Sequence, residues 1–215
     1  MIKKKNMYTI NFQSSQNESQ ITYNALEVFT EEELDAIHIG VSKIDFVEAT
    51  TLTDRRLAEH VTEDLELDES LPEIRRSHIK WITPCEEWLW LYERLVNLIE
   101  EANASLWRFN LVTAPEAIQY TEYWESENGH YDWHQDIGPG VGSLRKISLT
   151  IQLSNPDEYE GGDLEIWCGG NSVFKAEKQR GLACVFPSYM MHRVTPVTKG
   201  CRKSLVFWVG GTHYS

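Results

Sequence analysis

The part of the chain after residue 106 consists of short strand-like segments separated by turn residues, and this pattern constrains the fold most. Helical periods of apolar residues disappear there, and Gly, Asn and Pro recur between the segments. Many short strands with such punctuation are typical of a sandwich or barrel, not of alternating strand and helix units. A mainly β fold is therefore predicted. We expect strands at 106–112, 117–124, 130–137, 145–154, 163–167, 172–175, 182–186, 190–195 and 203–210.

Two helix starts are predicted in the first half of the chain. Thr30 and Glu33 have the spacing of a capping box, and a second box is expected at Thr83-Pro84-Cys85-Glu86, with Pro84 at the first helical position. The first box is followed by apolar residues at spacings of three and four, namely Leu34, Ile37, Val41 and Ile44. The second is followed by an apolar stripe formed by Trp88, Leu91, Tyr92, Leu95, Leu98, Ile99 and Ala102. We expect both helices to pack against the outside of the sheet.

The remaining segments of the first half are expected to form short strands at 8–12, 21–29, 46–51 and 74–82. Residues 52–73 have no clean hydrophobic period and carry a run of Asp and Glu. We interpret this acidic segment as a solvated loop. A lid near the mouth of a site is the alternative, because long loops in compact domains are often functional.

His134 and Asp136 stand two residues apart in one of the predicted strands. Side chains two apart on a strand leave the same face, so the imidazole and the carboxylate would point toward one place. Such a pair is a weak motif by itself, since a hydrogen-bonded surface pair has the same spacing.

A third potential ligand, His192, lies near the end of the chain, and Arg202 follows ten residues later. Two histidines and one carboxylate on one side of a metal form the facial triad of non-haem Fe(II) oxygenases, which leaves positions open for a co-substrate and O2. Arg202 has the chemistry to bind the far carboxylate of a dicarboxylic co-substrate. Trp208 follows Arg202 at even spacing, and so on the same face of a strand.

In these motifs the sequence resembles the Fe(II)/2-oxoglutarate-dependent dioxygenases, specifically the prolyl 4-hydroxylase-like branch with the bacterial PKHD-type hydroxylases. The resemblance runs from about residue 117 to 211 in the family's order. The matching pieces are Tyr131-x-x-His134-x-Asp136, Arg145 at the start of a strand, Glu160-Gly161-Gly162-Asp163-Leu164, and His192-x-Val194-x-Pro196-Val197-x-x-Gly200-x-Arg202 with Trp208.

The resemblance implies a double-stranded β-helix, or jelly roll, with the helices packed outside it. We expect one dioxygenase domain over 1–215, with N-terminal strands and supporting helices in 1–112 and the catalytic jelly roll in 113–215. The implied metal ligands and catalytic residues are His134, Asp136 and His192. The implied cofactors are Fe(II), 2-oxoglutarate as co-substrate and O2, with ascorbate as a candidate reductant.

The resemblance also implies which side chains bind the co-substrate. Arg202 is expected at its distal carboxylate, and Tyr123 and Tyr131 are expected to line the pocket. Gln152 stands where many prolyl hydroxylases carry a tyrosine, so one hydrogen bond to the co-substrate is in question. Trp208 is expected either to wall this pocket or to be part of the core.

The implied activity is hydroxylation of an unactivated C–H bond, with a peptidyl proline as the leading substrate. Hydroxylation of a free amino acid or another small metabolite is the first alternative. A metal-binding or protein-binding module without turnover is a second, although an intact triad and Arg202 argue against it. A zinc hydrolase reading of His130-x-x-x-His134 fails because Tyr131 stands where the catalytic glutamate is needed.

Composition limits the partners and the compartment. The formal net charge of −13 disfavours a nucleic-acid substrate, because phosphates would be repelled. No apolar run approaches the length of a membrane span and no secretory signal is recognised, so we expect a cytoplasmic protein with no membrane partner. The four scattered cysteines are expected to be free thiols. The substrate would be a protein, a peptide or a small molecule.

Overall fold

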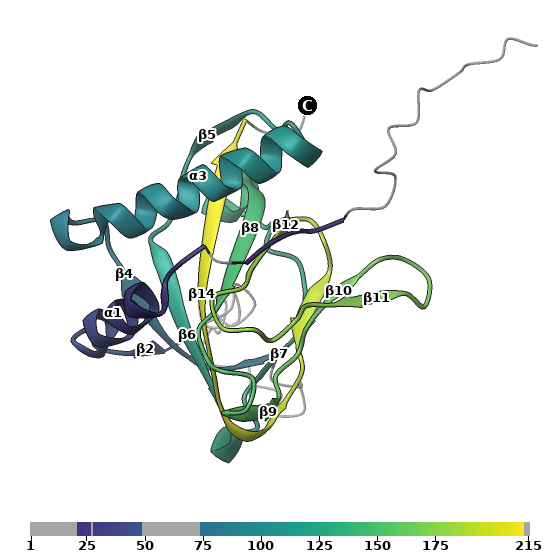
Figure 1. Cartoon of the computed structure of the whole chain (residues 1–215). Coiled ribbons are helices and arrows are strands. Elements are labelled where there is room, and N and C mark those ends of the chain that lie inside the picture. Colours follow the sequence, from purple (N-terminus) through teal and green to yellow (C-terminus); the bar gives the residue numbers. More distant parts are fainter. Residues whose placement is uncertain (1–20, 27, 49–73, 213–215) are drawn as a thin grey trace, which may run out of the picture.

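The computed structural model of the chain describes residues 21–26, 28–48 and 74–212. Within these ranges the strands form two antiparallel sheets of nine and five strands (Figure 1). The path through the larger sheet is β1 (Tyr23–Ala25), β12 (Ala183–Pro187), β8 (Arg145–Gln152), β14 (Val197–Gly211), β6 (Ile118–Trp124), β4 (His78–Ile82) and β2 (Val47–Glu48). Two further strands, β5 (Leu111–Thr113) and β9 (Tyr159–Gly161), pair with β14.

The smaller sheet faces the larger one, and the chain passes repeatedly from one to the other. Its order is β11 (Val173–Lys175), β10 (Leu164–Trp167), β13 (His192–Val194), β7 (His130–His134) and β3 (Arg75–Arg76). From β7 to β14 the chain crosses between the sheets five times: β7 is in the smaller sheet, β8 and β9 in the larger, β10 and β11 in the smaller, and β12, β13 and β14 then alternate. This arrangement is the predicted double-stranded β-helix.

Two helices in the described part cover the outer face of the larger sheet, as predicted (Figure 1). They are α1 (Glu31–Ser42) and α3 (Leu89–Leu106). Their buried side chains, among them Ile37 and Leu95, share one hydrophobic core with residues of β6, β8, β12 and β14. The main core therefore lies between helices and sheet, outside the space enclosed by the two sheets.

The two faces of β8 differ in chemistry. Ile147, Leu149 and Ile151 belong to the core under the helices. The alternate residues of the strand are Ser148, Thr150 and Gln152, which are also buried but face the smaller sheet. Buried polar side chains need partners, so this inner face is suited to a polar ligand and not to further apolar packing.

The helix starts were predicted correctly in one case and wrongly in the other. Thr30 caps α1, its hydroxyl accepting from the Glu33 N–H while the Glu33 carboxylate accepts from the Thr30 N–H. The second capping box does not form, because a 3-10 turn, η1 (Glu86–Trp88), precedes α3 and has Cys85 at its N-cap without a side-chain hydrogen bond. Pro84 thus lies before the helix. The tighter turn buries Trp88 under α1, where a Cβ added to Gly40 would lie 2.5 Å from the indole.

Several strand boundaries differ from the prediction because pairing partners decide them. Residues 74–82 form two strands in different sheets, β3 with β7 and β4 with β6. The expected strand at 106–112 is reduced to β5 because α3 continues to Leu106 and the Asn103 side chain bonds the backbone of Phe109. The expected strand at 203–210 belongs to the longer β14, and β9, which pairs with its beginning, was not predicted.

Other expectations are met in part or lie outside the described residues. Segments 21–29 and 46–51 contain β1 and β2, whereas 8–12 and the acidic segment 52–73 fall outside. A 3-10 helix, η3 (Gly140–Leu144), precedes β8, and another, η2 (Glu125–Glu127), follows β6. All four cysteines are free thiols. None of the described helices is long and apolar enough to cross a membrane.

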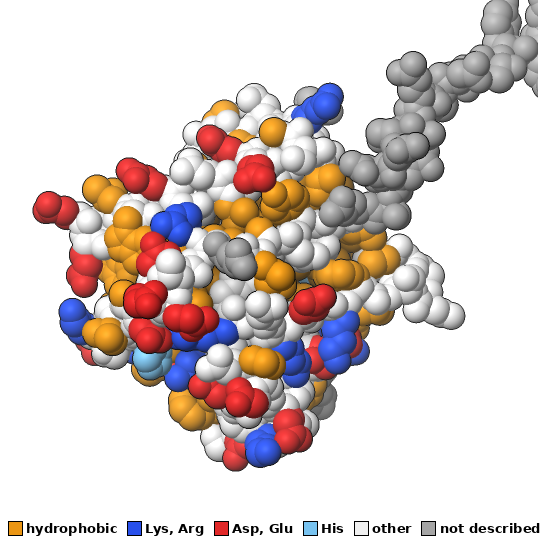
Figure 2. Space-filling view, viewed as in Figure 1, with side chains coloured by type: hydrophobic (Ala, Val, Ile, Leu, Met, Phe, Trp, Pro, Cys, Tyr) orange, Lys and Arg blue, Asp and Glu red, His pale blue; other side chains and the backbone are white. Residues whose placement is uncertain are grey.

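The face that carries α1 and α3 reflects the acidic composition (Figure 2). Asp and Glu side chains are spread over it, with Lys and Arg lying among them. Some of the opposite charges pair, as in Arg94 with Glu33 and Arg180 with Asp35. Such mixed, partly exposed pairs contribute little to stability and give this face no basic stripe.

The contact between α1 and Trp88 predicts the effect of one substitution. In Gly40→Ala the new methyl would overlap the buried indole, so we expect the free energy of unfolding to fall by about 1–2 kcal/mol, despite the better helix propensity of alanine. Ile39→Ala, at a 61% exposed neighbouring position, is the control and should change it by less than about 0.5 kcal/mol. Urea unfolding measures both, and an unchanged Gly40→Ala protein would contradict this packing.

Candidate active site

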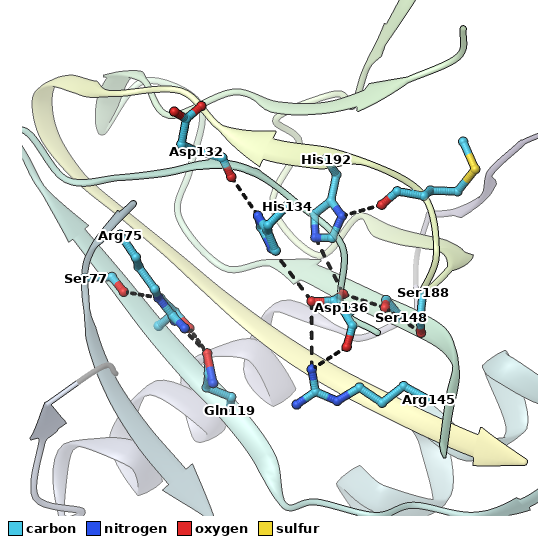
Figure 3. Close-up of polar contacts among 12 residues, drawn as sticks. Arg75, Ser77, Gln119, Asp132, His134, Asp136, Arg145, Ser148, Ser188 and His192 are labelled. Carbon is cyan, nitrogen blue, oxygen red and sulfur yellow. Dashed lines mark hydrogen bonds and ion pairs between the residues drawn. The ribbon is translucent and has the colours of Figure 1, made fainter. Parts of the chain in front are cut away.

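Three side chains predicted as metal ligands converge between the two sheets (Figure 3). His134 ends β7, and His192 begins β13 directly opposite it. The His134 Nε2 atom lies 3.7 Å from Asp136 Oδ1, and His192 Nε2 lies 3.5 Å from Asp136 Oδ2. One ligand atom from each residue falls within 4.8 Å of the others, which is close enough for one ion to contact all three.

Asp136 reaches this place by a route that the sequence analysis predicted wrongly. Strand β7 ends at His134, so Asp136 is not on the strand and does not share its face by alternation. Instead the Asp136 N–H donates to the Ser188 carbonyl at 2.9 Å, which ties the residue to the segment between β12 and β13. The carboxylate is positioned by this contact between distant segments.

An irregularity in β7 orients His134. Three residues of β13, from His192 to Val194, lie opposite four of β7, from His134 to Tyr131. Such a bulge reverses the alternation of side chains, so Tyr131 lies on the same face as His134. Their rings stack with centroids 3.4 Å apart. His130, which simple alternation would place on the ligand face, instead contacts the Asn128 carbonyl.

Both histidines direct Nε2 toward Asp136. The Nδ1 atom of His134 lies 2.7 Å from the Asp132 carbonyl, and that of His192 lies 2.9 Å from the Met190 carbonyl. A carbonyl can only accept, so each Nδ1 carries a proton, and in the neutral ring Nε2 is then the atom with a free lone pair. Two lone pairs and a carboxylate then face one another in a buried place, an arrangement that a cation would stabilise. The residues present thus fit a divalent metal.

The ionisation states agree with this view. Burial, with a smaller effect of His192, lowers the pKa of His134 to about 3 against the opposing effect of Asp136. Burial disfavours the charged form of Asp136, but His192, His134, Arg145 and the Ser148 hydroxyl outweigh it and lower the pKa of Asp136 to about 2. At neutral pH the group therefore has a neutral His134 and an ionised Asp136, the forms that bind metal.

A second group of residues supports Asp136. The Ser148 hydroxyl, on the inner face of β8, donates to Asp136 Oδ2 at 2.6 Å. Arg145 donates from Nη1 to the Asp136 carbonyl at 3.0 Å and from Nε to Glu116 at 2.6 Å. Its guanidinium also covers the Trp208 ring, 4.0 Å from the centroid. The sequence analysis missed Glu116 and Ser188, since no local pattern marks them.

Arg202 lies in a separate part of the interior. It is 3% exposed, donates to the Ser204 hydroxyl at 3.1 Å and lies over the Tyr123 ring, 5.5 Å from its centroid. A pocket beside it is lined from both sheets, by Thr150, Gln152, Leu164, Cys184 and Arg202 among others. In the described part of the chain no carboxylate forms an ion pair with Arg202, so its buried charge is available to a ligand.

Tyr159 of β9 also lines this pocket, although the sequence analysis did not single it out. Its hydroxyl accepts a hydrogen bond from Gln152 Nε2 at 3.0 Å. Burial raises the pKa of Tyr159 against the opposing effect of Arg202, so the phenol stays neutral and keeps a proton to donate. Tyr159 stands two residues before Gly161-Gly162, and this glycine pair was the sequence feature that could have drawn attention to it. In the structure both glycines have positive φ, 72° and 60°.

The other expected pocket residues lie apart from Arg202. Tyr131 is at the triad, and Trp208 lies next to Trp81, with ring centroids 6.4 Å apart. Neither is among the described residues that line the Arg202 pocket. Arg202 and Trp208 do share the inner face of β14, as predicted, but six residues of strand separate them.

Comparisons with known proteins agree with this geometry. Residues 118–210 match the 2OG-Fe(II) oxygenase superfamily. A PKHD-type hydroxylase of Xylella fastidiosa is 41% identical over 93 residues, which are 39% of this chain and 40% of the relative. The chain thus spans about two fifths of that relative's length in the match. A PKHD-type hydroxylase of Rippkaea orientalis is 28% identical over 188 residues, covering 85% of this chain and 75% of the relative.

Solved structures share the fold. A Pseudomonas putida prolyl-4-hydroxylase superposes with a TM-score of 0.65 at 20% identity, covering 91% of this chain and 95% of the other. A Trichoplax adhaerens prolyl hydroxylase, in complex with a hypoxia inducible factor peptide fragment, gives 0.67 at 17% identity, covering 90% and 84%. The jelly roll, the converging triad and the match over 118–210 lead to one conclusion, that this region of the chain is similar to the 2OG-Fe(II) oxygenase superfamily.

Proposed function

We propose that the protein is an Fe(II)- and 2-oxoglutarate-dependent hydroxylase. One observation carries the proposal: the triad and Arg202, a buried cation without a counter-charge in the described chain, lie in the same interior between the sheets. Bound Fe(II), with 2-oxoglutarate and O2, supplies the oxidising power that inserts one oxygen atom into a C–H bond, while 2-oxoglutarate becomes succinate and CO2.

The chain's own residues have positioning roles in this reaction. His134, Asp136 and His192 would hold the metal, with Ser148 and Arg145 fixing the orientation of Asp136.

The co-substrate pocket would bind the distal carboxylate of 2-oxoglutarate. Arg202 would bind it by charge-assisted hydrogen bonds, and Tyr159 would donate a further one. Tyr159 would thereby replace the tyrosine phenol that many prolyl hydroxylases carry at the position of Gln152. The Gln152 amide donates to the Tyr159 hydroxyl and orients it. Tyr123 would hold the Arg202 guanidinium in place from below.

The leading substrate is a peptidyl proline. Relatives named PKHD-type hydroxylases and a prolyl hydroxylase fold bound to a peptide support this choice. We further propose that residues 113–215 form the catalytic core and that 1–112 support it, in a cytoplasmic protein. Ascorbate would serve as a reductant, and the formal net charge of −13 disfavours a nucleic-acid substrate.

The first experiment measures succinate formation from 2-oxoglutarate with Fe(II) and O2, alone and with proline-rich peptides. We expect the peptides to stimulate succinate and to gain one oxygen on proline. In Arg202→Ala the dissociation constant for 2-oxoglutarate should rise by about 30-fold or more, because loss of one partner of a buried charge pair costs roughly 2–5 kcal/mol. Lys199→Ala, at an exposed position of the same strand, is the control. Absence of succinate under every condition would reject the proposal.

The support of Asp136 by Ser148 predicts a change in metal affinity. Ser148→Ala removes the hydrogen bond to the carboxylate and should weaken metal binding by about 10- to 100-fold. Titration calorimetry with Mn(II) in the absence of O2 measures this. Ser42→Ala, at an exposed position of α1, should bind Mn(II) like the unmodified protein. Equal affinities in both variants would show that the hydroxyl does not orient Asp136.

The position of Tyr159 predicts a change in co-substrate affinity alone. Tyr159→Phe should raise the dissociation constant for 2-oxoglutarate about 10-fold, because a hydrogen bond to a charged group contributes roughly 1.5 kcal/mol. Mn(II) affinity should stay constant. The exposed Tyr189 provides the matched control, Tyr189→Phe. If Tyr159→Phe binds 2-oxoglutarate normally, the phenol has only a packing role.

A further inference from the structure

A second arginine faces the triad from the opposite side of Tyr131. Arg75 of β3 pairs with Tyr131 of β7, and its guanidinium carbon lies 4.8 Å from the Tyr131 ring centroid. The Tyr131 ring in turn stacks on His134. Figure 3 shows the Arg75 side chain extending alongside the triad toward Gln119. A cation is thus held one aromatic ring away from a proposed metal ligand.

The partners of Arg75 among the described residues are all neutral. Nε donates to the Ser77 hydroxyl at 2.7 Å, and Nη2 donates to Gln119 Oε1 at 2.8 Å. Thr121 also donates to that oxygen, which fixes the orientation of the Gln119 amide. The guanidinium is therefore held in a defined place without neutralisation of its charge.

This lack of a counter-charge is unusual in a chain with 33 acidic and 20 basic residues. Over residues 21–26, 28–48 and 74–212, no carboxylate forms an ion pair with Arg75. Four other arginines of the same ranges each pair with an acidic residue, namely Arg94, Arg145, Arg180 and Arg193. A partly buried arginine without such a pair is one that a ligand's anion would stabilise.

Arg75 and Arg202 lie in different parts of the interior. Arg75 bonds Gln119, whereas Arg202 lies over Tyr123, and both contacts are on β6. Four residues of strand separate them, roughly 13 Å at the rise of a β-strand. The pocket beside Arg202 is lined by Thr150 and Gln152 of β8, on one side of β14. Gln119 lies on β6, at the other side of β14, and neither it nor Arg75 is among the described residues that line this pocket, so a small dicarboxylate held there is not the partner of Arg75.

Aromatic side chains complete the region near Gln119. Trp81 of β4 pairs with Gln119, and its ring approaches that of Trp208. The Trp208 Nε1 atom is buried and has no hydrogen-bond partner in the described structure. A fixed cation, aromatic side chains and a donor without a partner are groups with the chemistry to bind an organic anion.

We propose that Arg75 binds a carboxylate of the primary substrate, so that the hydroxylated compound carries this group near the reacting C–H bond. The inference rests on the proposed hydroxylase function and specifies its substrate class. A planar guanidinium held by Ser77 and Gln119 keeps an N–H edge for a carboxylate oxygen. The carboxylate has three sources, the α-carboxylate of a free amino acid, the C-terminus of a peptide, or an acidic side chain beside the target residue.

Matched acid and amide probes test the proposal on the full chain. The pairs are L-proline with L-prolinamide, a prolyl dipeptide with its C-terminal amide, and a blocked peptide with Glu or Gln beside proline. Binding is measured by calorimetry on protein loaded with Mn(II) and 2-oxoglutarate without O2, and succinate formation is measured in parallel with Fe(II). We expect the acid of at least one pair to bind about 10-fold tighter than its amide, and the pair concerned identifies the source.

Substitutions of Arg75 test whether the tighter binding of the acid depends on this residue. In Arg75→Gln the ratio between acid and amide should fall to near one, and Arg75→Lys should restore part of it. The control is Arg76→Gln, at the exposed next position of β3, which should keep the full ratio.

The outcomes separate the inference from the function on which it rests. The role of Arg75 is overturned if the unmodified protein binds acids and amides equally, or binds neither. It is also overturned if the preference for the acid is retained in Arg75→Gln. If succinate still forms with Fe(II) and 2-oxoglutarate in those cases, the hydroxylase proposal stands and only the substrate class is wrong.

Discussion

The packing of α1 and α3 on one face of the larger sheet is the constraint on which the rest of the structure depends. Because the helices bury the apolar face of β8 and its neighbours, the hydrophobic core lies outside the space between the sheets. The inner face can then carry Ser148, Thr150 and Gln152 without loss of the core. Stability and chemistry are assigned to opposite faces of the same strands.

The site is assembled at irregular points of this framework. A regular strand would direct Tyr131 and His134 to opposite faces, but the bulge in β7 brings their rings together. Asp136 lies beyond the strand and is fixed by the Ser188 carbonyl and the Ser148 hydroxyl. Departures from ideal strand geometry are common next to active sites, where they aim a side chain that alternation would misplace.

Charge distribution divides the interior into regions with different ligands. Arg145 is neutralised by Glu116 and supports Asp136 of the triad, whereas Arg202 and Arg75 have only neutral partners among the described residues. In an acidic chain such positive groups would mark the places where anions bind. The family motif in the sequence singled out Arg202 and Arg145 but gave no role to Arg75, because the partners of Arg75 come from residues far away in the chain.

Local patterns in the sequence determined the capped start of α1, the strand at β8 and the β class of the second half. The order of His134, Asp136, His192 and Arg202 carried the family resemblance. Only the tertiary structure showed that no helix starts at Thr83, that 74–82 is divided between two sheets, and that β7 has a bulge. It also decided the contacts of Tyr159, Glu116 and Arg75. The reason is physical. Periodicity and capping are set by neighbours in sequence, whereas strand register and the partner of a buried charge are set by segments that meet only in the folded chain.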